Sequence, residues 1–153
     1  MPGTILDNIL FGKPPDKKRL ELAIHCATLQ RELRKLRDRG LRTLVGMRGR
    51  EVSRAVARKI VLARTVYQNA DVNLFDDPFK DLSESDSRKV NDRLLLGAMA
   101  GKCCIVASNR VELMGSWGRL LMLRGGEVVY EGTPIEFTES EAFENQSYLQ
   151  ESV

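Results

Sequence analysis

Two short apolar runs separated by one helical stretch constrain the fold of this chain more than any other feature of its sequence. Residues 72–76 (Val-Asn-Leu-Phe-Asp) and 103–107 (Cys-Cys-Ile-Val-Ala) have the length of strands, and the second is continuously apolar, as in a buried parallel strand. Between them, residues 84–99 carry apolar side chains at helical spacing. Strand, helix and strand joined by short links predict a right-handed βαβ unit, and therefore an α/β fold.

The rest of the chain is expected to form helices at the front and a hairpin at the back. Turn signals, cap residues and apolar residues spaced by three and four positions locate these elements. They are an apolar segment over 3–12, a helix over 16–28 capped by Asp16, a continuation of its spacing by Leu29, Leu33 and Leu36, a loop over 41–51, a helix that begins at Ser53, a short helix over 110–114, a hairpin over 119–131 and a helix from Pro134.

Charge is unevenly distributed along the 153 residues, although the net charge is only +3. Residues 13–64 carry 16 Lys and Arg against 5 Asp and Glu, whereas residues 65–153 carry 8 against 15. The basic segment is either a solvated helix surface or a contact for an anionic partner such as nucleic acid, lipid headgroups or phosphate. We expect one boundary, near residue 51, between a basic helical part and an α/β part.

The composition is that of a globular protein, with 42% hydrophobic and 29% charged residues. No run approaches the roughly 18–20 apolar residues of a membrane-spanning helix, and the first twelve residues lack the Lys or Arg of a signal peptide. Three cysteines, Cys26, Cys103 and Cys104, are too few for a disulfide framework. We therefore expect reduced thiols on the cytosolic side, with Cys103 and Cys104 in the core.

The pair Asp76-Asp77 follows directly after the first predicted strand and precedes Pro78. An acid at the carboxyl end of a strand lies at the edge of the sheet where α/β folds bind ligands. There, one carboxylate can hold Mg²⁺ beside a nucleotide phosphate, and a second can polarise the attacking water. The alternative is structural, because a strand that ends in an Asp-Asp-Pro turn is common without any ligand.

Five segments of the chain together resemble the second half of a nucleotide-binding domain of an ATP-binding cassette (ABC) transporter. Within that family they are most similar to the first such domain of the multidrug-resistance-protein subfamily, the C subfamily. The resemblance covers about residues 3–137. The segments are 3–12 (GTILDNILFG), 45–49 (VGMRG), 60–67 (IVLARTVY), 74–79 (LFDDPF) and 123–133 (LRGGEVVYEGT).

The resemblance implies a partial P-loop NTPase fold of RecA-like type. Residues 1–51 would belong to a helical subdomain, and residues 52–153 to the C-terminal part of the nucleotide-binding core, ending in a β-hairpin. Asp76 would bind Mg²⁺, and Asp77 would take the place of the catalytic Glu. The implied cofactors are ATP and Mg²⁺. The implied partners are a transmembrane domain and a second nucleotide-binding domain, at the cytoplasmic face of a membrane, with an anionic membrane surface beside the basic segment.

Several positions depart from the family pattern. Ser53, Arg54 and Ala55 stand where relatives have the Ser-Gly-Gly of the signature motif, whose glycines let backbone amides approach the partner's ATP phosphate. Ser83 occupies the position at which relatives have the D-loop aspartate, and Asn109 occupies the position of their switch histidine. Asn can donate a hydrogen bond to a phosphate oxygen but cannot carry the proton of a histidine. The sequence has no Gly-x4-Gly-Lys-Ser/Thr motif, which the family places upstream of the matched segments.

Three functional hypotheses follow. The first is an ABC nucleotide-binding domain or a fragment of one, which couples ATP binding and hydrolysis to export in a parent protein and is inactive as an isolated chain. The second is an interaction module that keeps the fold without catalysis. The third is a small basic nucleic-acid-binding protein. Because only Phe11 and Tyr67 flank the basic region as aromatics, stacking on bases is poorly supported, and we expect no nucleic-acid partner.

Overall fold

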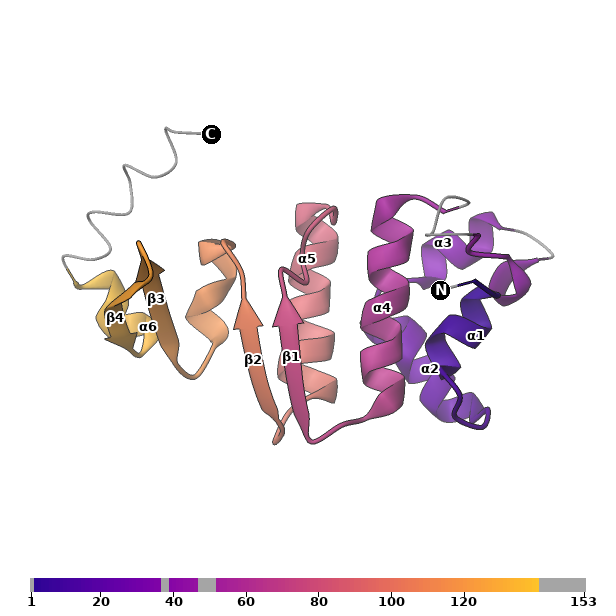
Figure 1. Cartoon of the computed structure of the whole chain (residues 1–153), viewed down its shortest axis with the longest axis horizontal. Helices are drawn as coiled ribbons and strands as arrows, with labels where there is room; N and C mark the ends of the chain where they lie inside the picture. The colour runs from indigo at the N-terminus through magenta and orange to yellow at the C-terminus, as the bar shows by residue number, and fades with distance from the viewer. Residues whose placement is uncertain (1, 37–38, 47–51, 141–153) are drawn as a thin grey trace. The chain divides into compact units, whose positions relative to one another are not determined.

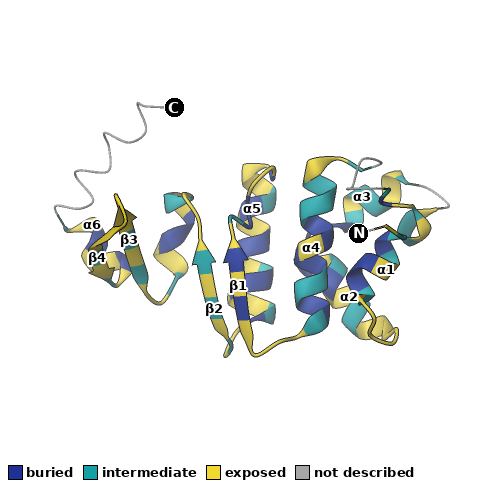
Figure 2. Ribbon diagram, viewed as in Figure 1, coloured by how far each residue is buried: buried dark blue, intermediate teal, exposed yellow. Residues whose placement is uncertain are grey.

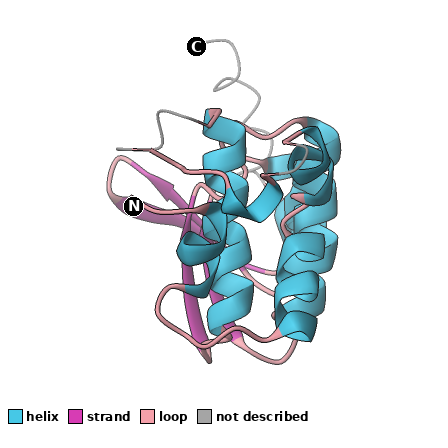
Figure 3. Cartoon of the chain, turned by 90° about the vertical axis from the view of Figure 1, so that its right-hand side faces the viewer, coloured by secondary structure: helices cyan, strands magenta, loops and turns pink. Residues whose placement is uncertain are grey.

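The computed structural model describes residues 2–36, 39–46 and 52–140. It divides into two compact units, one up to Asn109 and one from Arg110. Helices make up most of the regular structure beside a few short strands (Figure 3). The division near residue 51 into a helical subdomain and a nucleotide-binding core stays a prediction.

The first unit begins with helices, of which the spacing of apolar residues predicted those over 16–28 and from Ser53. They are α1 (Ile5–Leu10), α2 (Lys17–Cys26), α3 (Gln30–Lys35), the 3-10 helix η1 (Gly40–Arg42) and the long helix α4 (Arg54–Gln68). The predicted caps are confirmed, since Asp16 accepts a hydrogen bond from the Arg19 amide and Ser53 from the Val56 amide. Two details differ from expectation. The segment 3–12 contains a helix, and α3 is separated from α2 because Thr28 adopts a φ of 55°.

Helix α4 packs against α1 and α2 to form the core of this unit (Figure 1). Ile5, Ile9, Ala23, Ala63 and Tyr67 are fully buried there. The Tyr67 hydroxyl donates to the Pro14 carbonyl oxygen at 2.6 Å and accepts from the Asp16 amide at 2.8 Å. These contacts join the start of α2 to the end of α4, although the two lie about fifty residues apart in the sequence. The regularly spaced apolar residues of both helices are therefore the residues through which the helices contact each other.

Two parallel strands with a helical crossover follow α4, as predicted. Strand β1 (Val72–Asp76) pairs with β2 (Cys103–Ala107), with Val72 opposite Cys103 and Asp76 opposite Ala107. The crossover is not one regular helix over 84–99. It consists of α5 (Glu84–Val90) followed by a π-helical stretch, η3 (Asn91–Ala98). The Met99 amide donates to the Leu94 carbonyl five residues back, and both side chains are buried. The wider turn thus brings Leu94 and Met99 onto the same face.

The sheet of the first unit is buried on one face only, so the prediction of two core cysteines is wrong (Figure 2). Phe75 is buried, whereas Leu74 is 74% and Ile105 is 60% exposed. Cys103 is exposed and Cys104 is half-buried. A continuous apolar strand needs cover on both faces. Within the described residues, this two-stranded sheet has cover on the face that carries Phe75.

The second unit contains the predicted hairpin and helix. Its elements are the 3-10 helix η4 (Val111–Ser116), the antiparallel strands β3 (Leu120–Arg124) and β4 (Glu127–Gly132), and α6 (Pro134–Thr138). Gly125 and Gly126 take positive φ in the turn. Thr133 and Glu136 form a capping box at the start of α6. Phe137 is buried, and its ring meets that of Tyr130 edge to face at 4.9 Å between centroids.

Candidate functional site

The carboxyl ends of β1 and β2 bring three predicted site residues to the same edge of the sheet. Asp76 is the last residue of β1 and is paired with Ala107, the last residue of β2. The backbone amide of Asp77 continues this pairing by donating to the Ala107 carbonyl oxygen at 2.8 Å. Asn109 follows two residues after Ala107. The parallel register therefore places Asp76, Asp77 and Asn109 at the edge where α/β folds bind ligands.

The backbone at this edge turns sharply at Asp77. Asp77 has a φ of 44°, in the left-handed region, which Asp tolerates better than most residues. This conformation ends β1 and redirects the chain toward Pro78, which is buried. Asp76 and Asn109 are exposed, and Asp77 is half-buried. Their side chains can therefore reach a solvent-borne ligand.

A metal at this edge would take few ligands from this chain. In the parts of the chain that the structure describes, no three His, Cys, Asp or Glu side chains are grouped so that they could hold a metal ion. Mg²⁺ is commonly held by one or two carboxylates plus substrate phosphates, and the binding of Mg²⁺ by Asp76 stays a prediction.

The residues that the family resemblance assigns to the signature motif lie at the start of α4. Ser53 is exposed, and its Oγ accepts from the Val56 amide at 3.3 Å, so the hydroxyl hydrogen is available to a further acceptor. Arg54 is exposed and Ala55 is half-buried in the first turn. No hydrogen bond or ion pair described here joins these three residues to Asp76.

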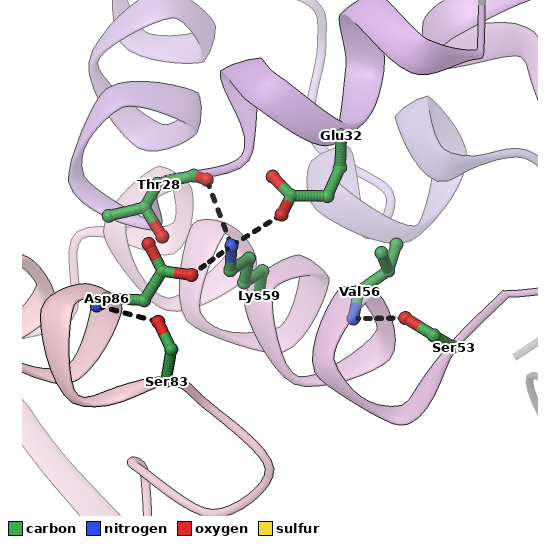
Figure 4. A network of polar contacts seen from close by, with 7 residues as sticks. All are labelled: Thr28, Glu32, Ser53, Val56, Lys59, Ser83 and Asp86. Carbon is green, nitrogen blue, oxygen red and sulfur yellow. Dashed lines mark hydrogen bonds and ion pairs between the residues drawn. The ribbon is translucent and has the colours of Figure 1, made fainter.

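Ser83 caps the next helix in the same way. Its Oγ accepts from the Asp86 amide at 3.2 Å at the start of α5. Ser83 is exposed, and its hydroxyl also hydrogen-bonds the carboxylate of Asp86, which helps to lower the pKa of that group. Ser53 and Ser83 therefore each cap the amino end of a helix by accepting from the amide three residues on (Figure 4).

A buried lysine that the sequence reasoning missed connects the two capped helices. Lys59 of α4 is 2% exposed, and its Nζ lies 2.7 Å from Glu32 Oε1 of α3 and 2.8 Å from Asp86 Oδ2 of α5 (Figure 4). It also donates to the Thr28 carbonyl oxygen at 3.3 Å. We call Thr28, Glu32, Lys59 and Asp86 the Lys59 cluster. The sequence signal was present, because Lys59 shares the helical spacing of the buried stripe Leu62, Ala63 and Val66.

The charges of the Lys59 cluster affect the pKa of Asp86. Partial burial by itself raises the pKa of this carboxyl group, because burial disfavours the charged form. The hydrogen bond and the positive charge of Lys59, together with the Ser83 hydroxyl and the charge of Lys89, outweigh that effect, and the net result is a pKa below the usual 3.8. Asp86 is therefore ionised at neutral pH, where it pairs with Lys59.

The sequence is similar to proteins of the ATP-binding cassette C subfamily. ATP-binding cassette sub-family C member 4 of mouse and of human are each 34% identical over 138 residues, which is 90% of this chain. The cystic fibrosis transmembrane conductance regulator of zebrafish is 34% identical over 87% of the chain. The chain spans about a tenth of the length of these relatives, 10% and 9% respectively. No protein-family profile matches the chain.

The fold is that of a segment of an ABC exporter. A bacterial Atm1-family ABC exporter with ATP bound superposes on all of this chain with a TM-score of 0.86, at 19% identity and over 27% of the exporter chain. The described residues contain no helix that is both long and apolar enough to cross a membrane. The fold agrees with the sequence similarity, and the chain belongs to the ATP-binding cassette C subfamily as a segment of about a tenth of its relatives' length.

Proposed function

We propose that this chain supplies part of the ATP site of an ABC-type nucleotide-binding domain, in a protein that couples ATP binding to transport across a membrane. The observation that carries the proposal is the register of β1 and β2, which sets Asp76, Asp77 and Asn109 at one edge of the sheet. Asp76 would hold Mg²⁺, Asp77 would orient the attacking water, and Asn109 would donate to a phosphate oxygen. Ser53 would offer its hydroxyl hydrogen, and Ser83 its exposed hydroxyl group, to a second site across a domain pair.

ATP binding by the chain alone should be weak or absent. In P-loop proteins, the backbone amides and the lysine of the loop supply most of the phosphate contacts, and Asp76 adds only a metal bridge. The printed sequence has no such loop. In our proposal the loop comes from another part of the parent protein, as do the transmembrane domain and the second nucleotide-binding domain.

Hydrolysis should be impaired even in a completed domain. Asp77 has a shorter side chain than Glu, Asn109 cannot take up a proton as His does, and Arg54 and Ala55 add side chains where relatives have glycine. Each lost transition-state contact can cost about 3 kcal/mol, on the order of 10²-fold in rate. These same changes favour the alternative of an interaction module without catalysis.

The test is a fusion protein in which the strand and P-loop half of a C-subfamily relative precedes the 153 residues in one chain. Binding of Mg-ATP should return and should weaken when Asp76→Asn removes the metal ligand. The matched control, Asp71→Asn, changes an exposed aspartate at the opposite end of β1 and should leave binding unchanged. A fusion that folds but binds no Mg-ATP, or in which both variants behave alike, would contradict the proposal.

Repair of the altered positions separates the ATPase from the interaction module. In the same fusion, Asp77→Glu with Asn109→His should restore turnover only together with Arg54→Gly and Ala55→Gly, if the domain pairs with itself. Turnover of a few ATP per second without any repair would show that the four substitutions are tolerated. Absence of turnover in the fully repaired fusion would favour the interaction module.

A further inference from the structure

The Lys59 cluster joins three helices through one ammonium group. Lys59 belongs to α4, Glu32 to α3 and Asp86 to α5, and Thr28 lies in the link between α2 and α3. In the sequence, each carboxylate lies 27 residues from Lys59, on opposite sides of it. No local turn therefore brings these groups together. The cluster is a tertiary contact that fixes the helices relative to one another.

The contact reaches the cap of α5 through Asp86. The carboxylate of Asp86 binds Lys59, while its backbone amide donates to Ser83 Oγ. Helix α5 therefore begins at a turn that is held from two sides, by its own serine cap and by the lysine of α4. In Figure 4 the line of contacts runs from Glu32 through Lys59 and Asp86 to Ser83.

Burial makes this arrangement sensitive to the charge on Lys59. The lysine side chain is 2% exposed, and those of Glu32 and Asp86 are 19% and 28% exposed. Removal of one member of a buried ion pair leaves its partner's charge without compensation, whereas replacement of all members by neutral groups is often tolerated. A variant in which all three side chains are neutral can therefore test whether the cluster positions α5, without the cost of an unpaired buried charge.

We propose that Lys59 is a positioning residue, which fixes the amino end of α5, and with it Ser83, against α3 and α4. The assignment of Ser83 to a nucleotide site rests on the proposed function, but the fixing of α5 by Lys59 does not. Lys59 touches neither β1 nor the edge of the sheet through any contact described here, so it would act on a site only through Ser83.

The test measures amide hydrogen exchange in the full chain by mass spectrometry of peptides. Lys59→Met should speed exchange in the first turn of α5, residues 84–87, by about tenfold or more relative to the first turn of α4. The first turn of α4 is the internal reference because its serine cap does not involve the Lys59 cluster. Lys59→Arg, which keeps the cation, should restore protection. The matched control is Arg88→Met, which breaks an exposed ion pair with Glu84 on the same helix and should change little.

A neutral triple variant keeps the test decisive if Lys59→Met fails to fold. Glu32→Gln, Lys59→Met and Asp86→Asn together leave no buried charge, and the backbone cap on Ser83 stays in place. The proposal expects a folded protein with a thermal transition near that of the wild type and with faster exchange at the start of α5. Protection of α5 equal to the wild type would overturn the proposal. So would unfolding of the triple variant, because the cluster would then be a requirement of the core.

The fusion protein gives a separate readout. If Ser83 serves a site across a domain pair, Lys59→Met should lower the turnover of the repaired fusion by about tenfold or more at unchanged affinity for Mg-ATP. Faster exchange in α5 with unchanged turnover would support the positioning role of Lys59 and count against the nucleotide role of Ser83. The two proposals therefore fail on different measurements.

Discussion

The pKa of Asp86 depends on a tertiary contact, the ion pair of Asp86 with Lys59. A carboxylate whose pKa is lower in the folded than in the unfolded chain stabilises the fold at high pH. For Asp86 that stabilisation is complete above the usual pKa of 3.8, and it is lost as the pH falls through the lower value of the folded state.

We therefore expect Asp86→Asn to lower the free energy of unfolding at pH 7 and to have progressively less effect below pH 3.8. Urea unfolding at pH 7, 5 and 3 measures this difference. Glu84→Gln, in the exposed pair with Arg88 on the same helix, is the control and should have little effect at any of these pH values. A gap between wild type and Asp86→Asn that widens in acid would contradict the assignment of the ion pair.

Arg64 makes a comparable contact on the other side of α4. Its Nε donates to the Asn8 carbonyl oxygen at 2.6 Å and its Nη2 to Asn8 Oδ1 at 3.0 Å, while the guanidinium lies 4.5 Å from the centre of the Phe11 ring. Burial lowers the pKa of Arg64 from its usual value, yet an arginine remains protonated in proteins. Arg64 and Lys59 together tie α4 to α1, α3 and α5.

At the scale of elements, serine caps determine where the two central helices begin. Ser53 precedes α4, and Ser83 precedes α5, each with an oxygen that accepts from the amide three residues on. A helix whose first amides lack such an acceptor is destabilised, because those amides have no partner within the helix. The Ser53 cap was predicted from sequence because Ser53 precedes a run of helical spacing, whereas the cap role of Ser83 was not predicted.

We expect Ser53→Ala to lower the free energy of unfolding by about 1 kcal/mol. Ser53→Asp keeps an acceptor at the cap and adds a favourable charge at the amino end of α4, so it should retain the stability of the wild type. Thermal unfolding of the three proteins tests this. Equal losses for Ala and Asp would show that Ser53 contributes through something other than its cap.

At the scale of the whole molecule, the basic segment 13–64 is the part suited to an anionic surface. Arg34 and Lys35 of α3 are exposed. Near an anionic lipid surface each Lys or Arg contributes roughly 1 kcal/mol. Under the proposed function, this surface would face the membrane-bound partner.

We expect Arg34→Glu with Lys35→Glu to weaken co-sedimentation of the chain with vesicles of phosphatidylserine and phosphatidylcholine at low salt. Arg88→Glu with Lys89→Glu makes the same change in charge on exposed positions of α5, outside the basic segment, and should weaken it less. If the wild-type chain does not bind such vesicles, or if both double variants lose binding equally, the basic segment is a solvated surface.

Residue pattern alone determined the local elements and their order. Periodicity and cap residues located α2, α4, β1, β2 and the hairpin, because each of these signals acts within a few residues. The parallel pairing of β1 and β2 also followed from sequence, since a helical crossover between two short strands leaves few other arrangements. Asp76 and Asp77 could therefore be assigned to the edge of the sheet in advance, and Asn109 followed from the family resemblance.

Only the tertiary structure decided which surfaces are covered and which charges meet. The exposure of Cys103 and Ile105 depends on how many strands and layers surround β2, and nothing within β2 records that number. The Lys59 cluster depends on the packing of three helices, because Glu32 and Asp86 each lie 27 residues from Lys59 in the sequence. A burial pattern can mark Lys59 as buried, but its partners are set by packing, because long-range contacts leave no periodic signal in the sequence.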